Sequence, residues 1–206
     1  MDNKTAIDEF NIWAQTGKDK GMEHGHASSV DRMGEILHER YDTKNIRSML
    51  DLGCGNGWML RKIRAKLTLD RAVGIDGASF MIDKANKIDP NGNYYCVDIN
   101  TWRPDQYFDL LMSMEFMYYL NNPRKTINNI MKYAANQNAI FIIGIDHYKE
   151  NVDSLSWPDD LSVKMKTLGI DEWIDIYKIS GLRNICYEQY GSTKKSTGTL
   201  IISGIK

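Results

Sequence analysis

The sequence predicts an α/β fold of three layers, in which a doubly wound, mostly parallel sheet lies between helices. Short apolar runs alternate with segments whose apolar residues recur at helical spacing. That alternation is typical of a sheet with helices on both faces. In addition, the run 49–52 leads into Gly53, Gly55 and Gly57, the pattern of a strand that enters a tight turn before a helix.

Seven apolar runs are predicted as strands. The first five alternate with helical segments and are therefore expected to run parallel. The last two, Arg183–Tyr190 and Thr199–Ile205, are joined by a polar turn without a helix, which predicts an antiparallel pair. The first five lie at 49–52, 72–76, 94–99, 108–114 and 139–145.

Helices are predicted where apolar residues recur three or four positions apart. Ser28 or Ser29 is expected to cap the first helix, and Ser79 the third. A later helix, 171–180, is expected to stop at Gly181. The first four helical segments are centred on 30–37, 58–67, 80–85 and 127–134.

Length and composition favour one domain. The 206 residues are enough for one sizeable core, and 26 basic against 27 acidic residues give a net charge of −1, which does not favour nucleic acid as a partner. No signal peptide and no membrane-spanning apolar stretch are recognised, so a membrane partner is not expected. Cys54, Cys96 and Cys186 are predicted to be buried thiols, and a cytoplasmic location is expected.

The spacing of the glycines separates two classes of cofactor. The dinucleotide fingerprint needs a third glycine where this chain has Trp58, so it fails. The pattern that fits is D-x-G-x-G-x-G, formed by Asp51, Gly53, Gly55 and Gly57. A tight strand–helix turn without a ligand is the structural alternative.

This pattern resembles motif I of the class I S-adenosylmethionine-dependent methyltransferases. The resemblance implies that Asp51 neutralises the ammonium group of the cofactor and that the glycines let its amino-acid tail lie on the backbone. It further implies that cofactor contacts extend to neighbouring residues. These are Cys54, Gly77, Met81 and Glu115.

Two later strand ends also carry acids. Asp76 follows the glycines by about the ~20 residues expected for a group that binds ribose hydroxyls, and a carboxylate can accept two hydrogen bonds from a vicinal diol. Asp98 ends the third strand. The resemblance implies that Asp98 accepts from the adenine amino group and that Ile99 packs on the ring. An N-cap role is the structural alternative for each acid.

The resembled fold has seven strands, with the last inserted antiparallel, and the strand count agrees. We expect one methyltransferase domain over residues 1–206. Residues 1–44 are expected to form an N-terminal helical cap and 45–206 the Rossmann-like core. The connection 146–181 is expected to be a lid over the substrate.

The residues at the end of the fourth strand exclude two classes of methyl acceptor. DNA amino-methyltransferases carry an Asn/Asp-Pro-Pro-aromatic sequence there, and this chain does not. Protein arginine methyltransferases carry paired glutamates, but Arg124 stands where the partner of Glu115 is needed. Small-molecule acceptors remain. Tyr118 and Tyr119 are candidate pocket residues, with a place in the core as the alternative.

The fifth strand end supplies the catalytic candidates. His147 is a candidate general base, because its ordinary pKa lies near ~6.5. Asp146 is expected to orient this base or to bind an acceptor amine. Tyr148 and Trp157 are candidate substrate residues. A solvent-facing loop is the alternative for His147.

The N-terminal segment holds His24 and His26 beside Gly25. Two histidines do not complete a zinc site, and no further Cys or His lies near them in sequence, so no metal is predicted. We expect this segment to fold over the cofactor, with one histidine touching its carboxylate or the acceptor. A surface turn is the alternative.

The sequence thus predicts an enzyme that transfers a methyl group from S-adenosylmethionine to N, O or S of a small molecule, leaving S-adenosylhomocysteine. A monomer or homodimer is expected. The alternatives are a nucleotide-dependent oxidoreductase on a similar sheet and a protein that binds the cofactor without turnover.

Overall fold

The computed structural model describes residues 4–193 and 197–206, and it contains a seven-stranded sheet of order β3-β2-β1-β4-β5-β7-β6. β7 runs antiparallel to both of its neighbours, and the other strand pairs are parallel. This confirms the predicted fold class, including the inserted antiparallel strand. The strands are β1 Ser48–Leu52, β2 Arg71–Asp76, β3 Asn93–Cys96, β4 Phe108–Met114, β5 Ala135–Ile145, β6 Arg183–Tyr190 and β7 Thr199–Ile205.

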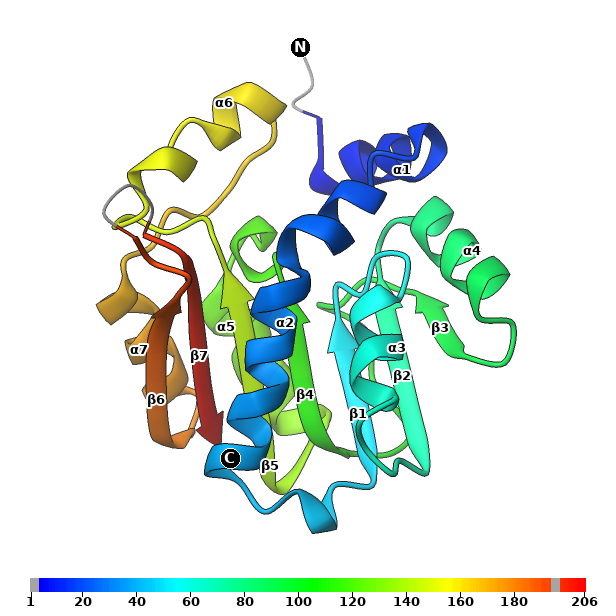
Figure 1. Ribbon diagram of the computed structural model, residues 1–206, viewed down its shortest axis with the longest axis vertical. Coiled ribbons are helices and arrows are strands. Elements are labelled where there is room, and N and C mark those ends of the chain that lie inside the picture. The colour runs from blue at the N-terminus through cyan, green and yellow to red at the C-terminus, as the bar shows by residue number, and fades with distance from the viewer. Residues whose placement is uncertain (1–3, 194–196) are drawn as a thin grey trace.

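Helices cover both faces of the sheet (Figure 1). α2, α3 and α4 contribute to the hydrophobic core on one face, and α5 and α7 to the core on the other. The helices are α1 Ala6–Thr16, α2 Lys20–Arg40, α3 Trp58–Arg64, α4 Ser79–Ile88, α5 Pro123–Tyr133, α6 Trp157–Leu161 and α7 Ile170–Ile179, with short 3₁₀ turns at Thr43–Asn45, Met117–Tyr119 and Val152–Ser154.

The side chains of the central strands alternate between the two cores. In β1, Leu50 and Leu52 pack on the side of α5 and α7, whereas Met49 packs on the side of α2 and α3. Successive residues of a strand point to opposite faces, so a strand covered on both sides must be apolar throughout. Asp51 is the exception in β1, and it lies at the end where the glycine turn begins.

Several predicted boundaries are wrong. α2 begins at Lys20, so Ser28 and Ser29 lie inside the helix and do not cap it. Ser79 is the first residue of α4, and Ala78 takes the N-cap position without a side-chain hydrogen bond. β3 stops at Cys96, so Asp98 lies in the loop beyond it, and β5 begins four residues earlier than predicted, at Ala135.

The three cysteines are free thiols in different surroundings. Cys54 is buried as predicted, but Cys96 is exposed and Cys186 is only partly buried, so the expectation of three buried thiols is wrong for these two. Among the described helices, none combines the length and apolar character that crossing a bilayer requires.

α1 and the start of α2 lie over the carboxyl ends of the strands, and the rest of α2 runs along one face of the sheet (Figure 1). The Phe80 N–H, at the start of α4, donates to the Asn11 side chain at 2.9 Å. A Cβ added at Gly77 would come within 2.8 Å of Ile7. α1 is therefore packed closely on the loop that follows β2, as a predicted helical cap requires.

Candidate functional site

A cavity of about 460 Å³ opens at the carboxyl ends of β1, β2 and β4. This volume falls within the range of roughly 300–1,000 Å³ that holds small ligands, and in a parallel sheet such ends are where ligands bind. The wall combines the glycine turn, the strand ends and the N-terminal segment. Its residues are Lys4–Ile7, Phe10, Asp19, Met22, Gly53–Asn56, Trp58, Ile75–Gly77, Met81, Val97–Asn100, Met114–Phe116, Tyr119–Asn121 and Lys164.

The glycine turn has a backbone conformation that residues with a side chain rarely adopt. Gly53, Gly55 and Gly57 all have positive φ, at 70°, 53° and 78°. A Cβ at Gly53 would lie 2.2 Å from the Phe116 ring, and one at Gly57 would lie 2.4 Å from the Tyr94 ring. At Gly55 the nearest atom would be the Met81 sulfur at 4.0 Å. Gly53 and Gly57 thus serve packing, whereas Gly55 leaves the cavity open.

Asp76 lies at the end of β2 and holds the turn in place. Its carboxylate accepts from the Gly55 N–H at 2.9 Å and from the Ala78 N–H at 2.8 Å. Burial raises the pKa of this carboxyl, and the backbone hydrogen bonds oppose the rise. Each oxygen accepts one backbone bond and keeps a second lone pair, which is available to a ligand in the cavity.

Asp51 is fully buried behind the turn and forms no part of the cavity wall. Neither of its carboxylate oxygens has a hydrogen-bond partner among the described residues. Burial, and secondarily the charge of Asp76, raise the pKa of the Asp51 carboxyl to about 8. A buried acid without partners is costly to keep ionised, and a nearby cation would lower that cost.

Asp98 and Ile99 both line the cavity, as does Cys54. The Asp98 carboxylate accepts from the backbone N–H and the side chain of Asn100, at 2.9 Å each. Asp98 also begins a turn, because its carbonyl oxygen accepts from the Trp102 N–H. Its side chain is exposed, so the carboxylate is open to a ligand as well.

The sequence analysis missed a buried polar contact between α2 and the glycine turn. Asp19, only 2% exposed, accepts from the Asn56 side chain at 2.8 Å and pairs with Lys84 at 2.6 Å. It precedes α2 without capping it, because its carboxylate points to these two partners. Asn56 and Asp19 lie 37 positions apart, and no sequence signal joins them.

Glu115 follows β4 with a left-handed backbone at φ 54°. A surface acid would be the alternative to a contact near the cofactor or acceptor, and it is wrong because the residue is only 5% exposed. Its Oε2 accepts from the Tyr118 hydroxyl at 2.6 Å, and its Oε1 accepts from the Asp146 N–H at 2.5 Å. Burial, and then the neighbouring charge of Asp146, raise the pKa of Glu115 well above its ordinary value.

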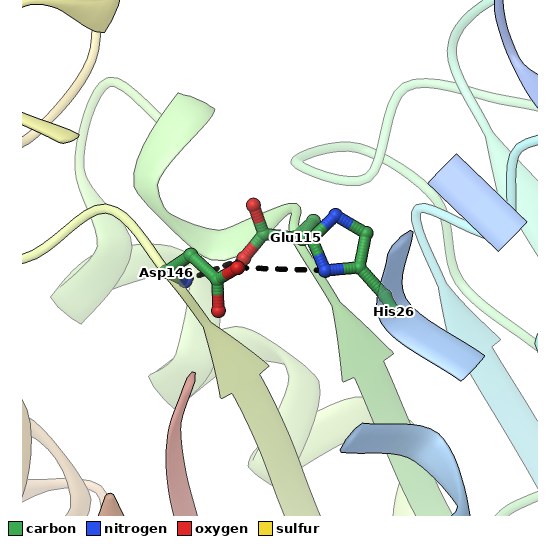
Figure 2. Close-up of side chains that lie close together, drawn as sticks. All are labelled: His26, Glu115 and Asp146. Carbon is green, nitrogen blue, oxygen red and sulfur yellow. Dashed lines mark hydrogen bonds and ion pairs between the residues drawn. The ribbon is translucent and has the colours of Figure 1, made fainter. Parts of the chain in front are cut away.

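Figure 2 shows His26 from α2 beside Glu115 and Asp146, which follow β4 and β5. The His26 Nδ1 lies 3.5 Å from the Asp146 carboxylate. Burial lowers the pKa of His26, and the charge of Asp146 opposes that shift. His24 is exposed, and neither His24 nor His26 lines the cavity. The surface-turn alternative is wrong for the backbone of both residues, because they lie inside α2.

His147, the candidate general base, does not reach the cavity wall, and the alternative of a solvent-facing loop residue is wrong because the side chain is fully buried. Its Nδ1 lies 2.9 Å from the Ser154 carbonyl, and its Nε2 lies 2.9 Å from the Thr167 hydroxyl. The carbonyl can only accept, so Nδ1 donates and Nε2 accepts from Thr167. Both ring nitrogens of the predicted base are therefore engaged by the protein.

Only one of the four aromatic residues predicted to contact the substrate lines the cavity. Tyr119 lines the cavity, whereas Tyr118, Tyr148 and Trp157 lie outside its wall. Tyr118 is held by Glu115, and the Tyr148 hydroxyl donates to the Gly198 carbonyl at 2.9 Å. Trp157 stacks on the His147 ring at 6.2 Å between centroids. The core alternative thus describes Tyr118.

The chain matches a family model described as a methyltransferase domain over residues 19–193. It is 27% identical over 143 residues to malonyl-[acyl-carrier protein] O-methyltransferase of Bacillus anthracis, covering 66% of this chain and 51% of that protein. It is 22% identical over 191 residues to trans-aconitate 2-methyltransferase of Shigella dysenteriae, covering 87% and 76%. The chain spans about half the length of the Bacillus relative.

Two solved structures share the fold. One is a Haloferax volcanii methyltransferase in complex with the Trm112 methyltransferase activator, with a TM-score of 0.81, 23% identity and coverage of 95% of this chain and 96% of that one. The other is the N-methyltransferase NodS of Bradyrhizobium japonicum in complex with S-adenosyl-L-homocysteine. Its TM-score is 0.64, with 18% identity and coverage of 89% and 87%.

Proposed function

Because this chain belongs to the class I S-adenosylmethionine-dependent methyltransferase family, we propose that it transfers a methyl group from S-adenosylmethionine to a small-molecule acceptor. The observation that carries the proposal is the cavity at the strand ends, where the glycine turn, Asp76 and Asp98 face one space. The three positions are far apart in sequence, and the fold brings them to one wall.

The residues present fit this cofactor. Gly55 leaves room against the turn, and the free lone pairs of Asp76 suit a ribose diol. Asp98 and Ile99 offer an acceptor and an apolar surface for adenine. Asp51 lies behind the turn and outside the cavity wall, so we propose that its unpartnered carboxylate favours the ammonium group of the amino-acid tail through its charge and not through direct contact. Met81 and Gly77 complete the wall beside the ribose.

The bound cofactor supplies an electrophilic methyl group on a sulfonium. The protein's task is to hold the acceptor atom in line with that group, and such orientation can lower the barrier by roughly 7–11 kcal/mol. Phe116 and Tyr119 line the cavity after β4 and are proposed to position the acceptor. Since His147 has both nitrogens engaged, we assign it to holding the 146–181 connection and not to proton transfer.

We propose small carboxylic acids as the acceptor class to test first. The two relatives named above act, by their names, on malonyl-[acyl-carrier protein] and on trans-aconitate. On the cavity wall Lys4 is paired with Glu9, whereas the exposed Lys164 has no ion pair among the described residues, and we propose that Lys164 meets the carboxylate of such an acceptor. Lys164 lies in the 146–181 connection, and this supports the lid proposed for that segment. Lys164→Ala should raise the KM for the acceptor while leaving cofactor affinity unchanged.

The cofactor proposal is tested by calorimetric titration with S-adenosylmethionine, S-adenosylhomocysteine and NADH. We expect the first two to bind and NADH not to bind. Asp76→Asn should weaken binding by roughly ten- to a hundredfold, because hydrogen bonds to a charged acceptor contribute about 1.5–3 kcal/mol. Asp70→Asn is the matched control, an exposed acid before the opposite end of β2. Equal affinities in the two variants contradict the assignment of Asp76.

Turnover is tested with methyl-labelled cofactor against a panel of small acids, amines, alcohols and thiols. Transfer of label to any of them supports the enzyme. Cofactor binding without transfer to any acceptor would favour the non-catalytic alternative, and binding of NADH alone would favour the oxidoreductase.

We propose a monomer or homodimer in a reducing compartment such as the cytoplasm, in keeping with the free thiols. The Haloferax volcanii neighbour was solved with an activator protein, so an activator is a second possibility for this chain. Sedimentation of the purified chain gives its oligomeric state. If turnover is absent alone but appears on co-expression with a Trm112-type protein, the activator is required.

A further inference from the structure

We propose that His26, Glu115 and Asp146 bind one divalent first-row transition-metal ion. One ligand atom from each residue lies within 4.8 Å of the other two. The residues come from α2, the end of β4 and the end of β5, and Figure 2 shows them turned toward one another. Fixed donors on three separate elements are what a preorganised metal site needs.

The donor set indicates the class of ion. One imidazole nitrogen and two carboxylates suit Mn²⁺, Fe²⁺, Co²⁺ or Zn²⁺, whereas an all-oxygen set would favour Mg²⁺ or Ca²⁺. Three protein ligands leave positions open for water or for a bound molecule. Because Glu115 lines the cavity, such a molecule can approach the ion from the cavity.

The Glu115 carboxylate is held by outer contacts of the kind found around metal ligands, and the loop that carries Asp146 is held through its backbone. The Tyr118 hydroxyl and the Asp146 N–H each donate to one oxygen of Glu115, which leaves a lone pair on each oxygen. The Asn151 side chain donates to the Asp146 carbonyl at 2.6 Å and fixes the loop. Glu115 takes a left-handed backbone in this position, a conformation that costs a residue with a Cβ about 1–2 kcal/mol.

The charges at this position are unbalanced. Within the described residues, Glu115 makes no ion pair, and Asp146 pairs only with His26. The Asp146 Oδ1 is buried and has no hydrogen-bond partner there. Two neighbouring carboxylates in a buried site are costly without a cation, and a divalent ion would neutralise both while using the unpartnered oxygen.

The sequence analysis predicted no metal because His24 and His26 have no ligating neighbours along the chain. The fold supplies them from positions 115 and 146. Binding of the ion does not depend on the proposed function, but a role for the ion in turnover rests on the proposed methyl transfer. There the ion would hold an anionic acceptor through its oxygens beside the cofactor cavity.

The test uses the full chain, stripped with chelator and without cofactor. Mn²⁺ is titrated and the free ion is followed by electron paramagnetic resonance. We expect saturation near one Mn²⁺ per chain. Glu115→Gln, Asp146→Asn and His26→Gln should each weaken binding about tenfold or more, and Tyr118→Phe should weaken it by about 10–100-fold through the outer contact.

Matched controls are His38→Ala, at an exposed position near the far end of α2, and Asp153→Asn, an exposed acid in the 146–181 connection. Both should bind Mn²⁺ as the wild type does. Circular dichroism identifies any variant that fails to fold, and the wild-type titration decides the matter without variants. Absence of saturable Mn²⁺ binding, or equal loss in the controls, overturns the inference. S-adenosylmethionine binding without Mn²⁺ binding would leave the proposed function intact, and the reverse result would leave the metal site intact.

Discussion

At the scale of single residues, Asp51 is the most consequential side chain. It is the one polar side chain among the four buried positions of β1, and the protein gives its carboxylate no partner within the described residues. A core position with a polar residue that stabilises nothing indicates a requirement other than stability. Asp51 therefore makes a clear prediction for the dependence of stability on pH.

The ordinary pKa of this carboxyl, 3.8, applies to the unfolded chain, and burial raises it to about 8 in the folded protein. Between these values the unfolded state binds fewer protons, so the contribution of Asp51 to the free energy of unfolding falls as pH rises from about 4 to about 8. Asp51→Asn removes this loss. The variant should gain on the wild type by on the order of a few kcal/mol between pH 5 and pH 8.

Urea denaturation of both proteins at the two pH values, without cofactor, measures that gain. A constant difference between variant and wild type would contradict the assignment of a raised pKa to Asp51.

The sequence located the acids at the strand ends because their place follows from the apolar runs before them. The sequence did not show whether Asp146 or His147 faces the candidate site. Adjacent residues of an extended chain point in opposite directions, so only one of the two can face it. His147 points toward Ser154 and Thr167, whereas Asp146 points toward His26. The side chain that points toward His26 is set by the position of α2, and no local sequence pattern contains that information.

At the scale of elements, the glycine turn combines backbone conformation with packing. Gly53→Ala meets two costs: a left-handed conformation, about 1–2 kcal/mol, and a Cβ that overlaps the Phe116 ring, about 1–3 kcal/mol more. Gly181→Ala meets only the first cost, since its φ is 80° and no atom lies within 4 Å of the added Cβ.

We therefore expect Gly53→Ala to lose about 2–5 kcal/mol and Gly181→Ala about 1–2 kcal/mol, as measured by thermal or urea unfolding. Gly53→Ala should also lose cofactor binding, because Phe116 must leave the cavity wall. Similar losses of stability in the two variants would show that the Phe116 ring moves away from the added Cβ without lowering the free energy of unfolding.

The sequence analysis placed the start of this helix at Ser28 or Ser29 and so missed the first two turns of α2. Gly21 and Gly25 weaken helix propensity there, and the regular apolar spacing begins only at Val30. Polar contacts hold this end of the helix instead. Asp19 reaches Asn56 and Lys84, and such contacts across the fold leave no periodic pattern in the sequence.

At the scale of the whole molecule, the sheet order was predictable because alternating strands and helices allow few topologies. The contact between α2 and β7 was not predictable from the sequence. Ser29 and Thr199 are both buried, and their hydroxyls lie 2.7 Å apart although 170 positions separate them. This contact joins the helix that carries His26 to β7.

Ser29→Ala or Thr199→Val leaves one buried hydroxyl without its partner and should cost about 1–3 kcal/mol. Removing both should cost less than the sum of the single changes, since no orphaned group remains. A double-mutant cycle by urea unfolding measures the coupling. Additive losses would mean that the two hydroxyls do not interact.

The position of β7 also orders events during synthesis of the chain. β7 follows β6 in sequence, yet it lies between β5 and β6, and among the strands of residues 4–193 and 197–206 β6 pairs with β7 alone. β6 is therefore synthesised before the strand that pairs with it, and β5 keeps an open edge until β7 is available. When Thr199–Ile205 emerges, it closes that edge and docks β6 in one step, so these residues complete the fold for segments made long before them.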